Sequence, residues 1–275
     1  MWIESVWQEP GRALYAWYHH ERIGVCPKLN VPEIGALVSR DGGESFTDLG
    51  IILSSGEWTD CSARNGYFAN GHGDFSVIAD RDREYFYFLF GAYGGDVSNQ
   101  GITIARMPFG NVSNPVGNVW KYHQGAWSEP GIGGPVTPVL PAAVSWREAD
   151  TDSFWGPSIH WNDHLRRYVV LMNRSFCWPG WPQEGVYITM NANLSDPSAW
   201  TQPKKFGEFG PTGIPGCSVW AKGKRAPRPV GVSDCSSGKP RSGRLCFARK
   251  RNRRHHQLNL TARGPAIAAV RPPCR

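Results

Sequence analysis

Apolar and polar positions alternate over short stretches of the chain, and Gly, Pro, Asn or Asp separates one stretch from the next. A period of two, with aromatic and β-branched residues at the apolar positions, predicts many short β-strands and no long helices. The same order of segments occurs three times. The predicted first strands are 3–7, 74–78 and 156–160, the second strands are 14–18, 85–89 and 168–172, and the third strands are 35–39, 101–105 and 185–189. A fourth, aromatic-bearing segment follows near Phe46, Trp120 to Trp127 and Trp200.

This order predicts an all-β fold. Four antiparallel strands that recur at a long, regular spacing are typical of the blades of a β-propeller. One blade cannot cover both of its own faces, so its neighbours must stack on it around an axis. A generic β-sandwich is the alternative, and the glycine that opens every predicted third strand argues against it. We therefore predict an incomplete β-propeller in which about three blades are recognisable.

One hairpin supports the propeller independently. The segment 39–46, Ser-Arg-Asp-Gly-Gly-Glu-Ser-Phe, fits the pattern S-x-D-x-G-x-x-[FW] and resembles the Asp-box hairpin of sialidase-like propellers. Asp41 is expected to cap the turn through backbone N–H groups, Gly43 to adopt unusual dihedral angles, and Phe46 to tuck inward. This motif is a folding device, so we expect no catalytic role for Asp41.

The first strand of the second blade carries the main catalytic candidate. Residues 72–77, His-Gly-Asp-Phe-Ser-Val, resemble the D-P-S-[VI] inner strand of five-bladed glycoside hydrolases of the arabinanase, xylosidase, levansucrase and invertase type. The resemblance implies a five-bladed propeller and a general base or nucleophile at Asp74. Phe75 stands where those families have proline. The alternative is that Asp74 only caps the start of a strand.

The first strand of the third blade, within 154–162, is similar to the W-A-P-[DS] strand of the same families. Ser158 stands where many members carry an aspartate. Asp150 or Asp152 could replace that aspartate from the rim of the funnel that a propeller forms along its axis. Trp155 and Trp161 could stack on a sugar ring, because an aromatic face matches the C–H face of a pyranose. Packing inside a blade is the alternative for each tryptophan.

Glycoside cleavage needs two carboxyl groups, one protonated and one ionised, on either side of the scissile bond. The partner of Asp74 must therefore come from another blade. Three glutamates are candidates. Glu4 lies on the first inner strand, Glu21 ends the polar run after the second strand, and Glu184 precedes a third strand and resembles the family's E-G acid.

Four histidines fall at or beside strands that should approach the propeller axis, where they could contact sugar hydroxyls. Some related propellers hold a central calcium ion beside a histidine, but zinc would need a tighter ligand set than this one. We expect sugar contacts or core packing rather than metal ligation, and we expect no other cofactor. These residues are His19, His20, His72 and His160.

Charge divides the chain into two parts. The formal net charge is +7, but residues 217–275 contain 15 Lys+Arg and a single acidic residue, which leaves 15 basic and 22 acidic residues in 1–216. We predict a partial propeller domain at 1–208 and a basic, low-order tail at 209–275. The abrupt change to Arg, Pro, Gly, Ser and Cys is typical of out-of-frame translation; a disordered native tail and a nucleic-acid-binding arm are the alternatives.

Other features exclude whole classes of protein. The N-terminus lacks the basic region and the apolar region that a signal peptide contains. No apolar run in the sequence is long enough to span a bilayer. The first blade starts at residue 2, so we expect truncation before it. Among the seven cysteines, Cys26 and Cys61 could pair in an oxidising compartment; free buried thiols are the more common state and the one we expect.

Together these observations predict a glycoside hydrolase-like propeller that acts on a carbohydrate by carboxylate catalysis in an axial funnel, without a nucleic-acid or membrane partner. A sialidase-like propeller that binds sugar or protein without cleaving it is the main alternative. A fragment with open sheet edges and no activity is the third.

Overall fold

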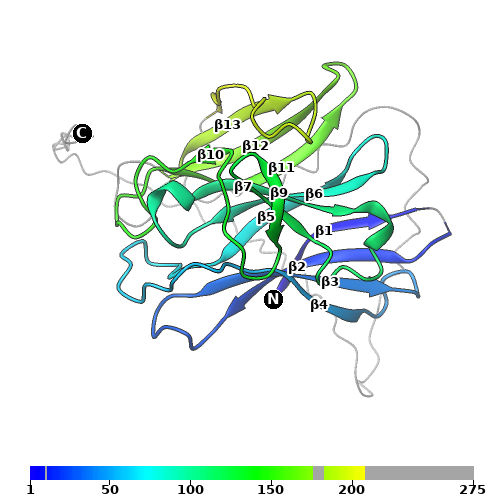
Figure 1. Cartoon of the computed structure of the whole chain (residues 1–275), viewed down its shortest axis with the longest axis horizontal. Helices are drawn as coiled ribbons and strands as arrows, with labels where there is room; N and C mark the ends of the chain where they lie inside the picture. Colours follow the sequence, from blue (N-terminus) through cyan, green and yellow to red (C-terminus); the bar gives the residue numbers. More distant parts are fainter. Residues whose placement is uncertain (10, 176–182, 208–275) are drawn as a thin grey trace, which may run out of the picture. The chain divides into compact units, whose positions relative to one another are not determined.

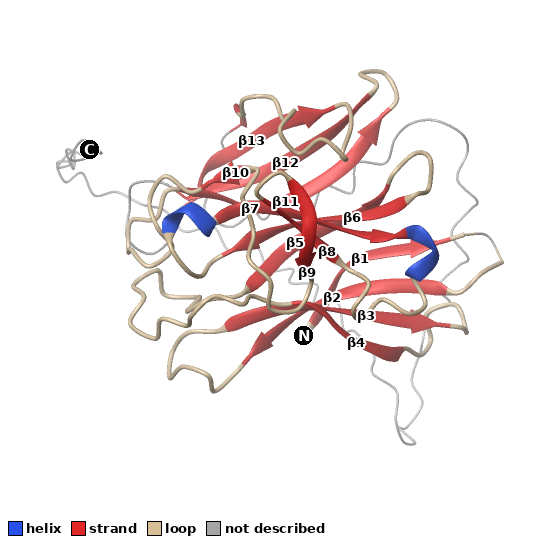
Figure 2. Ribbon diagram, viewed as in Figure 1, coloured by secondary structure: helices blue, strands red, loops and turns tan. Residues whose placement is uncertain are grey.

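Three antiparallel sheets follow one another along the chain (Figures 1 and 2). The structure is a computed structural model, and it describes residues 1–9, 11–175 and 183–207. All described strands belong to one unit, Met1–Cys217. The predicted boundary at 208/209 and the basic tail lie outside the described residues. Among those that are described, no helix is long and apolar enough to cross a membrane.

The first sheet is β1 (Trp2–Gln8), β2 (Leu14–Arg22), β3 (Val31–Ser39) and β4 (Thr47–Leu53), paired in that order. The second contains β5 (His72–Ala79), β6 (Tyr85–Ala92), β7 (Gly101–Pro108), β8 (Trp120–His123) and β9 (Ala126–Pro130), with β10 (Leu140–Pro141) beside β7. The third is β11 (Ser153–Asn162), β12 (Arg167–Ser175), β13 (Gln183–Asn191) and β14 (Lys204–Gly207). Short 3₁₀ turns at Val97–Asn99 and Phe109–Asn111 flank β7.

The predicted all-β class and incomplete propeller are confirmed, because each sheet runs outward from an inner strand in sequence order. The blade count of five rests on the family resemblance alone. Two details of the strands differ from prediction. Of the three glycines predicted to open third strands, Gly101 does open β7, but Gly185 is the third residue of β13 and Gly35 the fifth residue of β3. The ring of Tyr18 lies so close to Gly35 that a Cβ there would meet it at 2.0 Å. The fourth strand of the last sheet begins at Lys204, after Trp200.

The three inner strands, β1, β5 and β11, are joined by a repeated contact. The hydroxyl of Ser5 accepts the N–H of Val77 at 3.1 Å, and the hydroxyl of Ser76 accepts the N–H of Ile159 at 3.3 Å. Ser158 occupies the same position in β11. The serine at this position therefore matches the serines of the other two blades. This structural role explains Ser158 as well as the loss of a catalytic aspartate does.

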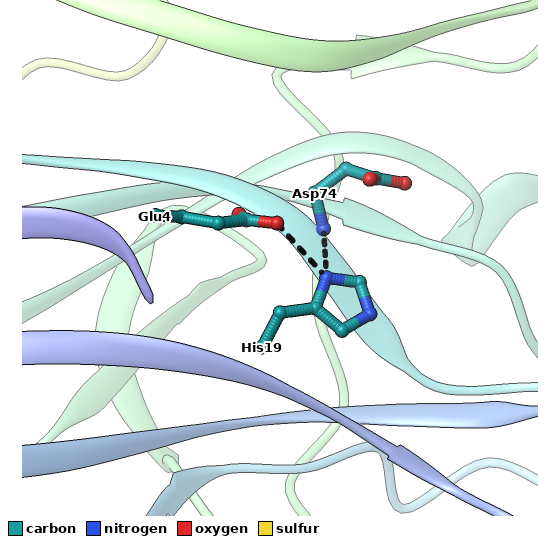
Figure 3. A group of neighbouring side chains, drawn as sticks. All are labelled: Glu4, His19 and Asp74. Atoms are coloured by element: carbon teal, nitrogen blue, oxygen red, sulfur yellow. Dashed lines mark hydrogen bonds and ion pairs between the residues drawn. The ribbon is translucent and has the colours of Figure 1, made fainter. Parts of the chain in front are cut away.

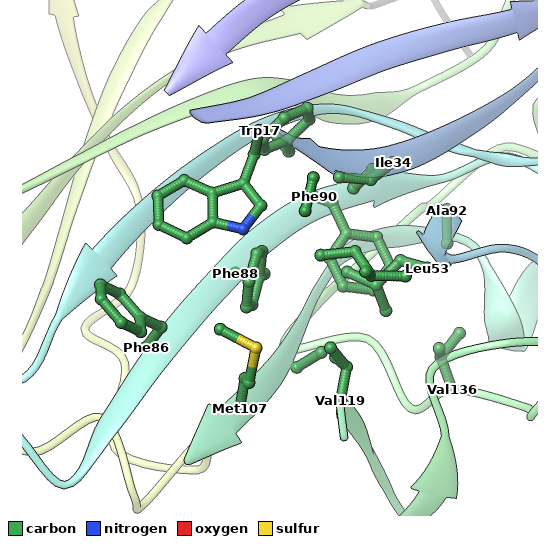
Figure 4. Packing of buried hydrophobic residues seen from close by; sticks show 14 residues of the cluster. Trp17, Ile34, Leu53, Phe86, Phe88, Phe90, Ala92, Met107, Val119 and Val136 are labelled. Carbon is green, nitrogen blue, oxygen red and sulfur yellow. The ribbon is translucent and has the colours of Figure 1, made fainter. Parts of the chain in front are cut away.

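Aromatic and aliphatic side chains fill the spaces between the sheets. Between the first and second sheets, Trp17 and Phe86 lie with their ring centroids 5.3 Å apart, and Phe88 and Phe90 are fully buried beside them (Figure 4). A second cluster, which includes Tyr87 and Val170, joins the second and third sheets. Burial of this apolar surface is the main force that stacks one blade on the next.

The Asp41 turn has the expected hydrogen bonds. Asp41 Oδ1 accepts the N–H of Ser45 at 2.9 Å, and Ser39 Oγ accepts the N–H of Gly43 at 2.8 Å. Hydrogen bonds from the Ser45 hydroxyl, the Ser45 N–H and the Ser39 hydroxyl hold the pKa of the Asp41 carboxyl well below its usual range. Phe46, in contrast, is 37% exposed, so the predicted inward tuck is wrong.

Cys26 and Cys61 form a disulfide, so the expectation of free thiols is wrong. The sequence could not show that the loop after β4 folds back onto the segment between β2 and β3. The Cα atoms of Cys26 and Cys61 lie 5.4 Å apart, within the range that a disulfide requires.

A fully buried lysine links the first two sheets. Lys121 Nζ donates to the carbonyl oxygens of Ser54 at 2.7 Å and Gly134 at 2.6 Å. Burial lowers the pKa of Lys121 to about 7, although Glu129 and Glu57 raise it in part.

This buried ammonium predicts a pH dependence of stability. Between pH 7 and about 10.5 the unfolded chain carries a proton on Lys121 that the folded chain does not, so the free energy of unfolding should rise with pH by up to about 1.4 kcal/mol per pH unit. In Lys121→Met this rise should be absent. Urea denaturation of both proteins at pH 7 and 9 measures it, with exposed Lys204→Met as the control; an equal rise in both proteins would contradict the assignment.

Candidate active site at the inner strands

Three titratable side chains meet where β1, β2 and β5 approach one another (Figure 3). The ligand atoms of Glu4, His19 and Asp74 all lie within 4.8 Å of one another. His19 Nδ1 lies 3.1 Å from Glu4 Oε1 and accepts the backbone N–H of Asp74 at 3.2 Å. His19 is completely buried. Two of the predicted carboxylates and one of the predicted histidines are therefore brought together.

Glu4 fixes the first inner strand against the second. Its Oε2 accepts the N–H of Phe75 at 2.7 Å, and its Oε1 accepts Nε1–H of Trp2 at 2.8 Å. The Trp2 indole stacks on His19, with ring centroids 4.3 Å apart and an interplanar angle of 22°. Trp2 remains 45% exposed, so this indole is held in place while part of it meets solvent.

The backbone of Asp74 is left-handed, with a φ of 46°. The matching position of the third inner strand is Gly156, with a φ of 58°, and both lie at a shift in strand register. A left-handed residue suits glycine, and a side chain there adds strain. The fold therefore favours a glycine at this position, and the second blade carries a carboxylate instead.

The environment of Asp74 raises the pKa of its carboxyl to about 6. Burial is the main cause, because the ionised form loses water contacts, and the nearby carboxylates of Glu4 and Glu21 add to it. The hydroxyl of Tyr93, which donates to Asp74 Oδ2, and the neighbouring His19 act in the opposite direction. The group is thus poised to change protonation near neutral pH.

Tyr93 contacts Asp74, although nothing in the sequence indicates it as a site residue. It follows β6 and lies in a run of glycines, which is typical of a turn rather than of a site. Its ring stacks on Phe68 at 4.3 Å and meets Trp146 edge-on at 5.0 Å, and Trp155 packs against the same cluster. Burial and the contact with Asp74 raise the pKa of Tyr93 well above its usual value, so it remains a hydrogen-bond donor.

Glu21 lies two residues beyond His19 on β2, and therefore on the same side of the strand. Its Oε2 accepts a hydrogen bond from Asn30 Nδ2 at 2.8 Å. Its charge reaches both Asp74 and Tyr93, whose pKa values it raises. Glu21 therefore acts on Asp74 through its charge, although it is not one of the three residues of the cluster.

The other two predicted carboxylates lie in contacts of the third sheet. Glu184 accepts hydrogen bonds from Tyr187 at 2.6 Å and Lys205 at 2.5 Å; burial alone would raise the pKa of Glu184, but these two donors lower it overall. A general acid requires the opposite shift. Asp152 forms a two-pronged ion pair with Arg174, at 2.8 and 2.9 Å. Neither belongs to the Asp74 cluster.

Three of the four predicted histidines also lie elsewhere. His20 is on the opposite side of β2 from His19, and its Nδ1 is 3.8 Å from Glu33 Oε2. His72 is buried against Phe90. Burial is the main cause that keeps the pKa of His72 well below 6.5, and the charge of Lys121 adds to it. For His160, burial also lowers the pKa.

Trp155 and Trp161 lie six residues apart on β11, about 20 Å along the strand, so they cannot stack on one sugar ring. Trp155 is near Tyr93. Trp161 lines a cleft of about 510 Å³ between the second and third sheets, where the guanidinium of Arg81 lies 4.5 Å from its ring centroid. An inner strand reaches from one end of the blade to the other, so each tryptophan stays a separate candidate for stacking on a sugar ring.

The chemistry of the cluster does not suit a calcium ion. Calcium takes six to eight oxygen ligands, whereas both oxygens of Glu4 already accept N–H donors and His19 Nδ1 accepts the N–H of Asp74. The described residues therefore do not fit a calcium ion as they are arranged, and we assign no metal to them.

No protein-family model matches the sequence, and a search of curated proteins finds no match. Among solved structures, the chain is similar to a glycoside hydrolase family 43 protein from Bacillus licheniformis, with a TM-score of 0.39, 16% identity, and coverage of 69% of this chain and 36% of that one. It is also similar to an endo-1,5-α-L-arabinanase from Thermotoga petrophila, with a TM-score of 0.38, 16% identity, and coverage of 69% of this chain and 36% of that one. For an exo-β-1,3-galactanase from Phanerochaete chrysosporium the TM-score is 0.35 and the identity 12%, with coverage of 73% of this chain and 48% of that one. The chain spans between a third and a half of the length of these structures. The fold assignment rests on the sheets themselves.

Proposed function

We propose that the Asp74 cluster cleaves glycosidic bonds of a carbohydrate, with Asp74 as the general base. One observation carries the proposal: a carboxylate with a raised pKa stands at a left-handed backbone position that glycine fills in the next blade. Strained backbone and shifted pKa values concentrate at functional sites.

The remaining groups have roles that follow from their contacts. Above pH 6 Asp74 is ionised and more basic than an ordinary aspartate, so it can take a proton from water that attacks the anomeric carbon. We assign to Glu21 the second carboxyl role that the reaction requires, which is donation of a proton to the leaving oxygen. Glu4 and His19 are positioning residues, because they hold β1 and the backbone of Asp74 in place. Tyr93 fixes the orientation of the Asp74 carboxylate.

Trp2 supplies the surface on which a sugar ring can rest. Its indole is held by His19 and Glu4 and keeps 45% of its surface exposed next to the cluster. The apolar C–H face of a pyranose suits such a flat aromatic surface. The proposed substrate is therefore a neutral sugar whose ring stacks on Trp2 beside Asp74.

Tyr93→Phe is expected to change the pH dependence of the reaction. The Tyr93 hydroxyl lowers the pKa of Asp74, so its removal should move the acidic limb of the kcat/KM profile from near pH 6 to a higher pH. Tyr15→Phe, at a ring that packs on Trp7, is the control. A profile that is identical in the parent and in Tyr93→Phe would exclude Asp74 as the titrating base.

A panel of substrates tests the reaction itself. Aryl glycosides, arabino-oligosaccharides and galacto-oligosaccharides should be incubated with the parent and with Asp74→Asn, and new reducing ends counted. We expect product from at least one substrate with the parent and none with the variant. Equal product with both proteins would refute the assignment of Asp74.

A binding module without catalysis is the second candidate. Glu184, at the position that resembles the E-G acid of those families, is paired with Lys205, and Ser158 stands where many of their members carry an aspartate. Ligand-induced changes in tryptophan fluorescence without product from any substrate would favour this candidate.

A further inference from the structure

An exposed tryptophan stands on the loop between β4 and β5, which leads directly into the strand of Asp74. Trp58 is 47% exposed. The guanidinium of Arg147 lies 4.6 Å from its ring centroid and covers one face, so the ring is held on that side. Arg147 is itself fixed, because its Nε donates to Asp60 Oδ2 at 2.7 Å.

Three further contacts hold the loop that carries Trp58. Asp60 accepts the N–H of Ser62 at 2.9 Å, and its own N–H donates to the carbonyl of Ala69 at 2.9 Å. The disulfide of Cys61 with Cys26 ties the loop to the segment before β3. A flat apolar side chain that is exposed and fixed in this way binds a ligand at a low cost in conformational entropy.

The loop lies beside the Asp74 cluster. Arg147 follows Trp146, whose ring lies 5.0 Å from that of Tyr93, and the Tyr93 hydroxyl donates to Asp74. Contacts through Tyr93, Trp146 and Arg147 therefore connect the Trp58 ring to the proposed base, and Trp58 itself is not part of the Asp74 cluster. A sugar ring stacked on Trp58 is not the ring whose bond Asp74 attacks.

We propose that Trp58 is a second stacking surface and that the substrate is a chain of several sugar rings rather than a mono- or disaccharide. This inference rests on the proposed function for the position of the reacting bond, but not for the binding of the chain. Its physical basis is that two separate fixed indoles, Trp2 and Trp58, suit two separate rings of one oligosaccharide.

Binding must be measured without cleavage, so the experiment uses the full chain with Asp74→Asn and, beside it, Asp74→Asn with Trp58→Ala. The probes are α-1,5-arabino-oligosaccharides and β-1,3-galacto-oligosaccharides of two to six rings, titrated by calorimetry. We expect affinity to rise with chain length, and Trp58→Ala to weaken the longest probes about tenfold while the disaccharide is unchanged. Trp120→Ala, an exposed tryptophan on β8, is the matched control and should change nothing.

The outcomes separate this inference from the proposed reaction. Absent binding, affinity that does not depend on length, or a Trp58→Ala variant with parental affinity for every probe overturns the second surface. Length-dependent binding that Trp58→Ala removes, in a parent that releases no product, leaves the second surface standing and overturns the reaction. Cleavage by the parent, together with unchanged binding in Trp58→Ala, leaves the reaction standing and overturns the second surface.

Discussion

Asp74→Asn is expected to lower the rate of hydrolysis by about 10³-fold or more without lowering stability. General-base catalysis contributes roughly 10²–10⁴-fold, and the amide cannot accept the proton. The folded chain favours the neutral carboxyl, because burial raises its pKa to about 6 from 3.8. Parental stability should therefore fall as pH rises between these two pKa values, by about 1.4 kcal/mol per pH unit, and the variant should not show the fall.

Asp74→Gly completes this test. Glycine suits the left-handed φ of 46°, so this variant should unfold at a temperature equal to or above that of the parent and yet be inactive. Asp82→Asn, at an exposed turn position beyond β5, is the control for loss of a charge. Thermal unfolding at pH 4 and 7 and initial rates are measured on all four proteins. A destabilised Asp74→Gly would show that Asp74 has a structural role instead.

Loss of the disulfide is expected to have the largest effect on stability. Cys26 and Cys61 are 35 positions apart, and a cross-link over such a loop contributes about 3–4 kcal/mol by restricting the unfolded chain. Cys26 is also buried against Leu29 and Ala69, so its side chain contributes to packing.

The test uses Cys26→Ser combined with Cys61→Ser, because the double substitution leaves no unpaired thiol from this bridge. Urea denaturation of the double variant should show a free energy of unfolding lower by about 3–4 kcal/mol. The parent in a strong reductant should approach the same value. Identical denaturation curves with and without reductant would show that the bridge adds no stability.

The strands could be predicted because their signal is local. In β6, Phe86, Phe88 and Phe90 all face the first sheet, which is the period of two expected for one buried face. The repeated order of such strands then predicted stacked blades. The pattern predicts the ends of the strands less accurately. Gly35 lies inside β3 because the ring of Tyr18, on a neighbouring strand, leaves no room for a Cβ at this position.

The site was predictable only where strand position sufficed. The strand pattern predicts Asp74 and Glu4 on neighbouring inner strands, and they do meet. The Cys26–Cys61 bridge depends on how long loops return to the sheets, and sequence spacing carries no information about that. Tyr93 directly follows β6, but its position among glycines is typical of a turn and does not indicate a site residue. Motif resemblance alone indicates Trp161 and Glu184 as site residues, but a motif does not fix which end of a blade a side chain occupies.

The central claim is that a sugar binds with its scissile bond beside Asp74. A crystal structure of Asp74→Asn with a galacto- or arabino-oligosaccharide tests it directly. We predict a sugar ring on Trp2, with room for one water between the anomeric carbon and the side chain at position 74, and with the glycosidic oxygen within hydrogen-bond reach of Glu21. An oligosaccharide bound instead in the cleft lined by Trp161 would contradict this claim.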